Sequence, residues 1–577
     1  MKLSTIASLI TATLVSIVAA QQPNTGNHPD WPRWCGKVYE SGYPSFEPGG
    51  ETLEPVSNGS TYLHMQFKPR YSLYLSSEKT ASFVVNAALS PWYGEAYSQG
   101  YLTSSSSTNE LEFSITLGGG GATSYSKPLV TNQKIGINET GREYSFSLTG
   151  LKPSRTPYSV VLSGKLTTGS SKQRYTATSS LLYLPDNPAG SATKIDHLKG
   201  GLLFKNAQTN QQFTPLLPYG YYGLYNGSNS TAASEDFVKN YTSSGYGLNA
   251  IISLAGYADT NPVYNSMDEH GLRFMFDLRG SYKNLTDTQI RVNTIKNHTS
   301  LFAYWTGDEP DGWEVPFNIT PAATDLIHHL DPYHPVAVTL NCQNYYFGAY
   351  SIGADILMED VYPIGINATF SKWNTTCNTT LGDCGCDNCA GNVQDVPSRL
   401  DDLARYEEWL GRWPLPKFHN PQVFSGEGYW ARDPTPDEAR AMNALAFNRG
   451  ATGIFGWTWP SSAVLFDTHA NMSHVVTNEP VRSFLLSGKP QRLSVAGYDL
   501  LDAAYWVVGD KALVSVVWGA YEKIQKPVSI DIPGVEATDI ESVAFGGLSW
   551  QLSDGNKLTI KSLPAMSTSL ILLNLKS

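Results

Sequence analysis

Three patterns of hydrophobic and polar positions follow one another along the chain. From residue 31 to 194, short alternating runs such as ASFVVNAAL and YSVVLSGKL are separated by Gly, Ser, Asn and Pro. This alternation is typical of antiparallel strands with one buried face, and it predicts a β-sandwich over residues 31–194. Alternation returns over residues 491–577, in runs such as ALVSVVWGAY and TSLILLNL. There it predicts a small all-β domain of six to eight strands, serving either as a structural cap or as a carbohydrate contact.

The middle of the chain, residues 195–490, alternates apolar runs with segments of helical period. Thr435 to Glu438 has the form of a capping box with Pro436 at the first helical position, Gly450 ends that helix, and Thr320-Pro321 begins another. The candidate strands are LLPYGYYG, LNAIISLAG, LRFMFDLRG, FAYWTGDEP, PVAVTLNC, DILMEDVYP, PQVFSGEG and GIFGWTWP. Eight such units over about 290 residues predict a (β/α)8 TIM barrel. The expected fold is therefore multidomain, a central barrel flanked by an N-terminal β-sandwich and a small C-terminal all-β domain.

The N-terminus carries the signals of export. Lys2, an apolar run from Leu9 to Val18 and the small residues Ala19 and Ala20 predict a signal peptide over residues 1–20. The alternative is a membrane anchor, but the run is shorter than the roughly 20 apolar residues that a span needs. Asn-x-Ser/Thr sequons occur at Asn58, Asn138, Asn226, Asn229, Asn240, Asn284, Asn297, Asn318, Asn367, Asn374, Asn378 and Asn471. We therefore expect a secreted, extracellular protein with N-glycans attached.

Composition narrows the class of partner. Only 16% of residues are charged, against the usual quarter, and the net charge is −11. The net negative charge argues against nucleic acid and against an anionic membrane as partners. A surface rich in Ser, Thr, Asn, Gly and Tyr suits a neutral polar ligand instead. An oligo- or polysaccharide fits that description.

Six cysteines remain to be explained, four of them between Thr375 and Gly391. An even number in an exported chain favours disulfides, and fifteen pairings of six cysteines are possible. The spacing C-x-C-x-x-C is also found in zinc sites, but no His cluster accompanies it here. Three aspartates at predicted strand ends offer oxygen ligands for Ca²⁺, but no loop has a recognised calcium spacing. We therefore expect a stapled loop, no metal and no cofactor.

The chemistry of a TIM barrel lies at the C-terminal ends of its strands. The predicted strand ends deliver carboxylates, amides and aromatic rings, with no Lys and no His among them. Such groups bind sugars, because acids and amides hold hydroxyls and aromatic rings stack on sugar faces. Packing at the barrel rim is the alternative role for the tryptophans, including Trp305. The candidate substrate-binding residues are Asp277, Asp308, Asn341, Asp360, Tyr362, Gln422, Trp457 and Trp459.

Glycoside hydrolysis needs one carboxyl that protonates the leaving oxygen and a second that attacks or activates water. Glu309, at the end of the fourth predicted strand, is the candidate acid/base, with a helix cap or an Arg partner as the alternative role. Glu427, after the seventh strand, is the candidate nucleophile. Asp360 and Asp277 compete for that second role, and Gln422 competes for the strand end itself.

The strand-four motif Asp308-Glu309-Pro310 resembles the Asn-Glu-Pro motif of the clan A glycoside hydrolase superfamily, in which the Glu is the acid/base and the nucleophile Glu ends strand seven. The resemblance assigns the acid/base role to Glu309 and puts Asp308 where the family has Asn. A closer resemblance is to fungal secreted barrel proteins, through the segments Trp305 to Gly312, Asp360 to Ile364, Gly382 to Cys389 and Gly426 to Thr435. The resemblance implies the barrel fold and a glycosidase-like activity. Our leading hypothesis is a secreted glycosidase that cleaves a wall or extracellular glycan with retention. The alternative is a sugar-binding barrel that does not hydrolyse.

Overall fold

The computed structural model describes residues 29–97, 110–118, 127–167, 173–223, 236, 238, 239, 241, 242, 247–253 and 262–576. The expected signal peptide, residues 1–20, lies outside the described residues, as do three sequons, those at Asn226, Asn229 and Asn240. Within the described part, no helix has both the length and the apolar character needed to span a bilayer.

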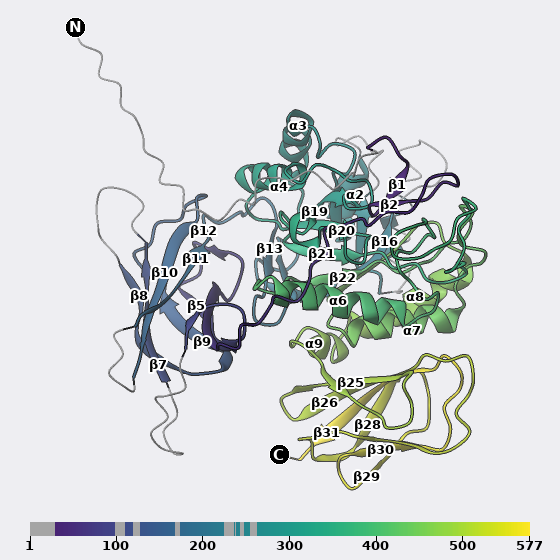
Figure 1. Ribbon diagram of the computed structural model, residues 1–577. Coiled ribbons are helices and arrows are strands. Elements are labelled where there is room, and N and C mark those ends of the chain that lie inside the picture. Colours follow the sequence, from purple (N-terminus) through teal and green to yellow (C-terminus); the bar gives the residue numbers. More distant parts are fainter. Residues whose placement is uncertain are drawn as a thin grey trace.

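Eight parallel strands form a closed barrel at the centre of the molecule (Figure 1). They are β16 (Tyr219–Tyr222), β17 (Ala250–Ser253), β18 (Arg273–Asp277), β19 (Leu301–Asp308), β20 (Val336–Leu340), β21 (Ile356–Glu359), β22 (Lys417–His419) and β23 (Gly453–Gly456). The pairing of Tyr219 with Ile454 joins the first strand to the last. Most of these strands are buried at every position, as in β20, because side chains fill the barrel on one side and helices cover it on the other.

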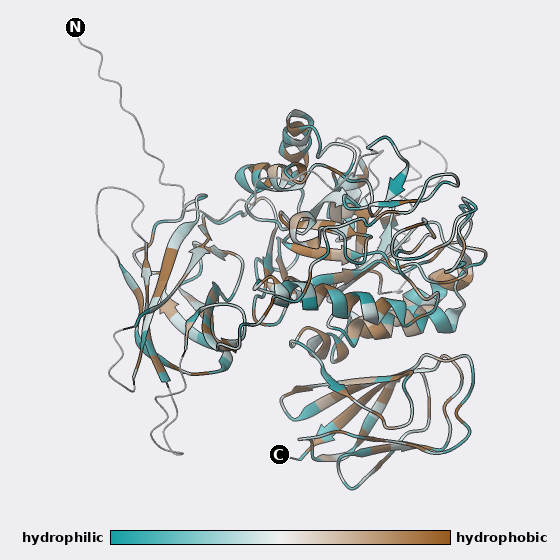
Figure 2. Ribbon diagram, viewed as in Figure 1, coloured by the Kyte–Doolittle hydropathy of each residue, from teal (hydrophilic) through white to brown (hydrophobic). Residues whose placement is uncertain are grey.

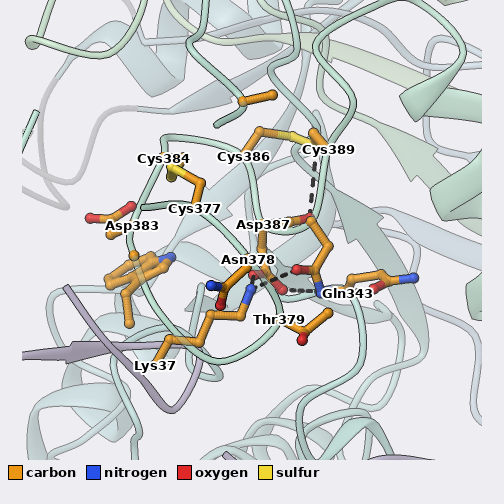
Figure 3. Close-up of a pocket in the computed structure, with 14 residues that line it drawn as sticks. Lys37, Gln343, Cys377, Asn378, Thr379, Asp383, Cys384, Cys386, Asp387 and Cys389 are labelled. Atoms are coloured by element: carbon orange, nitrogen blue, oxygen red, sulfur yellow. Dashed lines mark hydrogen bonds and ion pairs between the residues drawn. A yellow bond between two sulfur atoms is a disulfide. The ribbon is translucent and has the colours of Figure 1, made fainter. Parts of the chain in front are cut away.

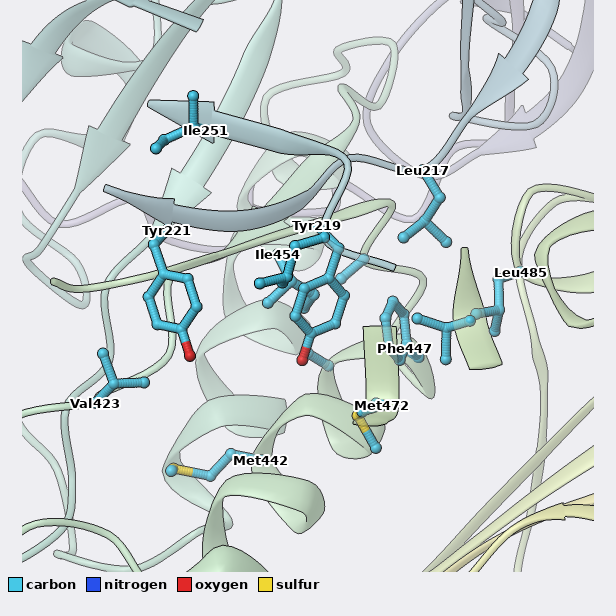
Figure 4. Packing of buried hydrophobic residues seen from close by; sticks show 14 of the residues in the cluster. Leu217, Tyr219, Tyr221, Ile251, Val423, Met442, Phe447, Ile454, Met472 and Leu485 are labelled. Carbon is cyan, nitrogen blue, oxygen red and sulfur yellow. The ribbon is translucent and has the colours of Figure 1, made fainter. Parts of the chain in front are cut away.

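The helices of the barrel are α2 (Pro262–His270), α3 (Leu285–Ile295), α4 (Ile319–Leu330), α5 (Phe347–Tyr350), α6 (Asp395–Trp409), α7 (Pro436–Phe447), α8 (Ala463–Val476) and α9 (Val481–Leu485). In Figure 2, α6 and α7 show apolar and polar colours side by side, as amphipathic helices do. The largest apolar cluster lies between the strands and these helices. Figure 4 shows the rings of Tyr219 and Tyr221, from β16, directed toward Met442 on α7 and Met472 on α8.

The predicted capping box of α7 is confirmed. The Thr435 side chain accepts from the Glu438 amide at 3.3 Å, and the Glu438 carboxylate accepts from the Thr435 amide at 2.7 Å. The predicted start of α4 at Thr320-Pro321 is slightly late, since the helix begins at Ile319 after Asn318. Pro321 is tolerated there because the first turn of a helix leaves its N–H groups without intrahelical partners.

The seventh strand is not where the sequence pattern predicts it. The barrel uses Lys417–His419 as β22, whereas PQVFSGEG makes two isolated bridges, from Gln422 to Trp457 and from Gly426 to Trp430. Pro421 cannot donate to a strand ladder, so the regular pairing of β22 ends before it, and only the Pro421 carbonyl and the Val423 amide bond to Trp457 beyond that point. The expectation that no His ends a barrel strand is also wrong. His419 ends β22 and is fully buried, with Nδ1 2.5 Å from the carboxylate of Glu359 on β21.

Removing the imidazole of His419 should destabilise the barrel. The His419→Leu variant leaves the buried Glu359 carboxyl without that partner, at an expected cost of about 3 kcal/mol. Denaturant unfolding of the variant measures this loss. The double variant His419→Leu/Glu359→Leu removes both polar groups and should recover most of the stability. Wild-type stability in the single variant would contradict the argument.

Two all-β domains adjoin the barrel, the N-terminal one at the left and the C-terminal one below it in Figure 1, which confirms the predicted fold class. The N-terminal sandwich has two four-stranded sheets around one apolar cluster. Their orders are β11 (Tyr175–Leu181), β10 (Tyr158–Leu166), β7 (Glu110–Leu117), β8 (Pro128–Gly136), and β6 (Glu95–Ala96), β3 (Tyr62–Pro69), β5 (Thr80–Ser90), β9 (Glu139–Ser147). Smaller sheets pair β12 (Tyr183–Leu184) with β4 (Tyr74–Leu75), and β13 (Ala192–Ile195), β14 (Leu202–Lys205) and β15 (Thr214–Leu216) with one another.

The C-terminal domain contains eight strands, within the predicted range, and packs against α7, α8 and α9. Its five-stranded sheet has the order β24 (Gln491–Leu493), β25 (Leu501–Val508), β26 (Lys511–Trp518), β31 (Thr568–Leu575), β28 (Ala537–Phe545). Its three-stranded sheet has the order β27 (Val528–Asp531), β30 (Lys557–Ile560), β29 (Gln551–Ser553).

The first described residues do not join the sandwich. They form a hairpin of β1 (Arg33–Trp34) and β2 (Lys37–Val38) beside the barrel (Figure 1). A disulfide from Cys35 to Cys342 ties this hairpin to the end of β20. The other disulfides join Cys377 to Cys384 and Cys386 to Cys389, within the predicted stapled loop. All six cysteines are therefore paired, and no thiolate is left to hold zinc.

Candidate active site

A cleft of about 330 Å³ lies over the C-terminal ends of the barrel strands. Its carboxyl groups belong to Asp308, Glu309, Asp360, Asp383 and Glu427. Its aromatic rings belong to Trp34, Trp313, Tyr362, Phe424, Tyr429, Trp430 and Trp457. None of the lining residues, all within the described part of the chain, is a Lys, Arg or His. The cleft is thus acidic and aromatic, which suits hydroxyl-rich, uncharged ligands.

Glu309 directly follows β19 and has a left-handed backbone, with φ of 49°. This conformation is uncommon for a residue with a side chain, and such strain is found preferentially at functional sites. The amide of Glu309 donates to the carbonyl of Thr339 on β20 at 3.1 Å, which fixes the turn. Its carboxyl accepts from the Asn341 side chain, with Nδ2 to Oε1 at 3.0 Å.

Asn341 bridges Glu309 to a second acid. The same Nδ2 donates to Oδ1 of Asp360 at 3.3 Å, so the two carboxyl groups lie next to each other. Glu309, Asn341 and Asp360 follow three consecutive strands, β19, β20 and β21. Because parallel strands end at the same rim of the barrel, the residues that directly follow these strands lie close together in space.

The electrostatics of this pair favour bound protons. Burial raises the pKa of Glu309 well above its usual value, and the charges of Asp360 and Asp308 raise it further. Burial likewise raises the pKa of Asp360 to about 7. Because the two carboxyls interact strongly, they titrate as a unit, and the pair favours the protonated form.

Asp308 belongs to a second polar cluster at the base of the cleft. Arg279 donates Nη1 to Asp308 and Nε to Asp277, each at 3.0 Å. The guanidinium also lies against the rings of Tyr222, Trp305 and Trp457. Burial raises the pKa of Asp308, while the Arg279 charge acts in the opposite direction. Asp277 is therefore engaged by the protein itself, and Asp308 is the member of this cluster that reaches the cleft.

The cleft brings together seven of the predicted site residues: Asp308, Glu309, Asn341, Asp360, Tyr362, Glu427 and Trp457. Asp277, Gln422 and Trp459 are not among its lining residues. Gln422 is fully buried and exchanges hydrogen bonds with the backbone of Ile364, at 2.9 and 3.0 Å. Trp459 packs edge-on against Tyr221 and Phe466. Trp305 is fully buried, so its ring fills the barrel.

Glu427 lies on the rim of the cleft in an exposed turn. It has φ of 55° and stands between Gly426 and Gly428, whose φ angles are also positive. The turn is closed by the backbone pairing of Gly426 with Trp430. Lys372 donates Nζ to the Glu427 carbonyl at 2.8 Å. The carboxyl of Glu427 is thus presented from a different loop than the Glu309 and Asp360 pair.

Sequence reasoning missed several residues that line the cleft, above all Trp34. Its indole N–H donates to Oδ1 of Asn341 at 2.8 Å across 307 positions of sequence. No local pattern predicts so distant a contact. The available signal was the cysteines, because Cys35 and Cys342 are the chain neighbours of Trp34 and Asn341. Asp383, also missed, accepts from the Tyr429 hydroxyl at 2.5 Å.

The protonated carboxyls predict how stability depends on pH. The unfolded chain releases the protons of Glu309, Asp360 and Asp311 near pH 4, whereas burial raises the pKa of Asp360 to about 7 and of Asp311 to about 6 in the folded protein. The folded state therefore binds more protons, and the free energy of unfolding should fall as pH rises from about 5 to 7. Thermal unfolding across this range checks the sign. In Asp360→Asn, which mimics the protonated acid, the slope should flatten, and a wild-type slope would contradict the assignment.

Comparisons with known proteins give no family for this chain. No family model matches it, and no curated protein matches it. Similar solved structures include a protein from Bacteroides fragilis NCTC 9343 provisionally named an alpha-galactosidase, with 12% identity, 91% of this chain and 100% of that chain covered, and a TM-score of 0.42. A GH30 endoxylanase from Clostridium papyrosolvens C71 has 12% identity, coverage of 62% and 96%, and a TM-score of 0.38. The beta-glucuronidase of Parabacteroides merdae has 12% identity, coverage of 89% and 74%, and a TM-score of 0.32. These neighbours are glycoside hydrolases, and the resemblance to fungal barrel proteins stays a prediction.

Proposed function

We propose that this protein is a secreted glycoside hydrolase that cleaves a neutral wall or extracellular glycan with retention of configuration. The observation that carries the proposal is the carboxyl pair of Glu309 and Asp360, held by Asn341 in an aromatic cleft and shifted toward the protonated form. A carboxylic acid that keeps its proton near neutral pH is what protonation of a leaving glycosidic oxygen requires.

Glu309 is the proposed acid/base, and Glu427 is the proposed nucleophile. Retaining enzymes hold their two carboxyls about 5–5.5 Å apart, on opposite sides of the bond that breaks. Glu309 and Asp360 accept from one nitrogen and interact directly, which leaves little room for a sugar ring between them. Asp360 is therefore better suited to keeping Glu309 protonated. Glu427 lines the same cleft from a separate loop, and the proposal puts it on the other side of the sugar.

The lining of the cleft selects the class of sugar. Tryptophan and tyrosine rings offer platforms for sugar faces, and the acids accept hydrogen bonds from hydroxyls. A uronate would meet five carboxyl groups there and no cationic side chain among the lining residues. Neutral hexoses or pentoses are therefore the proposed substrates.

Export is part of the proposal. All nine described sequon asparagines are exposed, so each is sterically open to a glycan. Three disulfides that use every cysteine suit an oxidising compartment. Mass spectrometry of the protein secreted by a eukaryotic host, before and after deglycosylation, tests the N-glycans and the three disulfides together.

The experiment that tests the activity is a screen of aryl glycosides and neutral wall polysaccharides, with product stereochemistry followed by NMR. The expected result is hydrolysis of at least one neutral glycoside, with the product first appearing in the anomeric configuration of the substrate. First appearance of the opposite anomer would overturn the Glu427 nucleophile. Turnover of uronides alone would overturn the neutral substrate class.

One observation favours a second candidate, a sugar-binding barrel without hydrolysis. The end of β22 carries His419 and then Asn420, so strand seven itself presents no carboxylate. A glycan array separates the two functions. Binding of a defined neutral glycan that survives prolonged incubation uncleaved would establish the binding protein and remove the hydrolase.

A further inference from the structure

We infer that Trp34 is a positioning residue that orients the Asn341 side chain toward the two acids of the cleft. The inference rests on the proposed function, because it assigns Trp34 a role in the same acid pair. It makes the N-terminal hairpin of β1 and β2 an integral part of the active site. This hairpin is more than 300 positions from Asn341 in the sequence.

The argument begins with the chemistry of a carboxamide, which has an accepting oxygen on one arm and a donating nitrogen on the other. The indole N–H of Trp34 is a donor only, so it selects Oδ1 of Asn341, at 2.8 Å. The nitrogen arm must then point the other way, toward Oε1 of Glu309 and Oδ1 of Asp360, at 3.0 and 3.3 Å. Reversal of the amide would turn its oxygen toward the two acids.

Hydrogen bonds already fix the backbone of Asn341. Its amide N–H donates to Asp311 at 3.3 Å, and its carbonyl accepts from Nη1 of Arg399 at 2.5 Å. The residue as a whole is buried, with 6% of its surface exposed. Rotation of the terminal amide is therefore the main freedom that remains, and Trp34 removes it.

The hairpin is anchored on both sides of Trp34. Cys35 is joined to Cys342, which follows Asn341, and Arg33 pairs with Glu314 at 2.6 Å. Lys37, on β2, donates to Asp387 and Asn388 of the stapled loop, at 2.6 and 2.7 Å, and Figure 3 shows Lys37 next to Asp387.

The neighbouring residues Gly312 and Trp313 form a space that fits the Trp34 ring. A methyl group added at Gly312 would lie 2.4 Å from the indole, so the glycine leaves the space that the ring occupies. Trp313 packs edge-on against the same ring, with centroids 5.0 Å apart. The disulfide, the ion pairs and these ring contacts together hold the indole N–H of Trp34 in one place.

Other charged groups also face the acid pair. They are Asp308 with Arg279, Asp311, Glu359 with His419, and the cleft acids Asp383 and Glu427. The Trp34 N–H donates to Asn341 rather than to any of these, so Trp34→Phe removes none of their hydrogen bonds. A shift in the titration of the pair would then report on the amide.

The test is Trp34→Phe, which keeps an aromatic ring in the cleft and removes the N–H. Donation to an ionised carboxylate lowers its pKa, so loss of the oriented NH₂ should raise the apparent pKa values of the pair. We expect kcat to fall about tenfold, KM to change little, and the acidic limb of the pH profile to move to higher pH. The matched control is Trp518→Phe in the C-terminal domain, which also removes an indole hydrogen bond, to the Glu522 carbonyl at 2.6 Å.

A change in KM alone, with an unchanged pH profile, would show that Trp34 is only a sugar platform and would overturn the inference. Carbon-13 NMR titration of labelled Asp and Glu carboxyls gives a readout that needs no substrate. If the wild-type protein hydrolyses nothing, the proposed function fails, but a shifted carboxyl titration in Trp34→Phe still supports the positioning role. An unchanged titration overturns it. If Trp34→Phe does not fold, Asn341→Ala, which removes the oriented amide directly, should show the same titration shift.

Discussion

Replacing Glu309 with Gln should lower kcat/KM on a glycoside with a poor leaving group by about 10³-fold while leaving the fold intact. General acid catalysis contributes roughly 10²–10⁴-fold, and glutamine keeps the shape of the protonated acid but has no proton to give. The Asn341 contact to Oε1 is retained by the glutamine carbonyl. The measurement is steady-state kinetics on an alkyl glycoside of the sugar found by the substrate screen.

Leaving-group dependence makes this prediction specific to a general acid. A dinitrophenolate leaves without protonation, so Glu309→Gln should retain far more activity on the dinitrophenyl glycoside than on the alkyl glycoside. Glu541→Gln is the matched control, because Glu541 is a surface residue of the C-terminal domain paired with Lys511. Equal losses on the two substrates would remove the acid/base role, and full activity on both would remove Glu309 from the chemistry.

Replacing Glu427 should lower turnover by at least about 10³-fold and permit rescue by an added nucleophile. In Glu427→Gly the carboxyl is gone, and glycine accepts the positive φ of 55° at this position without strain. Azide can then enter the space of the carboxylate and attack the sugar carbon directly. The product should be a glycosyl azide of inverted configuration, detected by NMR.

Variants of Asp360 should behave differently from Glu427→Gly. If Asp360 keeps Glu309 protonated, Asp360→Asn lowers the pKa of Glu309, because the asparagine removes a neighbouring negative charge. The alkaline limb of the pH profile should therefore move to lower pH, with no rescue by azide. Azide rescue of Asp360→Gly in place of Glu427→Gly would make Asp360 the nucleophile. Rescue of neither, together with glycan binding, would favour the non-hydrolysing barrel.

Part of the site was predictable because strand ends have a fixed place in this fold. Asp308-Glu309, Asn341 and Asp360 follow apolar runs that the sequence marks as strands, and the parallel barrel gathers their ends at one rim. The same reasoning failed for strand seven. Lys417–His419 is short, and two of its three residues are charged or polar, so hydrophobic periodicity does not reveal it.

Side-chain partners account for the other differences. Gln422 and Asp277 have the residue types of a sugar site, but the structure engages them with the Ile364 backbone and with Arg279. Residue type alone does not tell whether a polar side chain points to a ligand or satisfies the protein. The competing partners lie at long range, and only packing decides between them.

The sequence by itself determined the barrel, its two all-β neighbours, the capping box of α7 and the position of Glu309 at a strand end. These follow from periodicity and local hydrogen bonding, which act over a few residues. The tertiary structure alone decided that Asp360 lies against Glu309, that both carboxyls favour the protonated form, and that Trp34 reaches Asn341 across 307 positions. Those properties depend on burial and on contacts between distant segments, because a carboxyl responds to the charges and solvent around it and not to its neighbours in the chain.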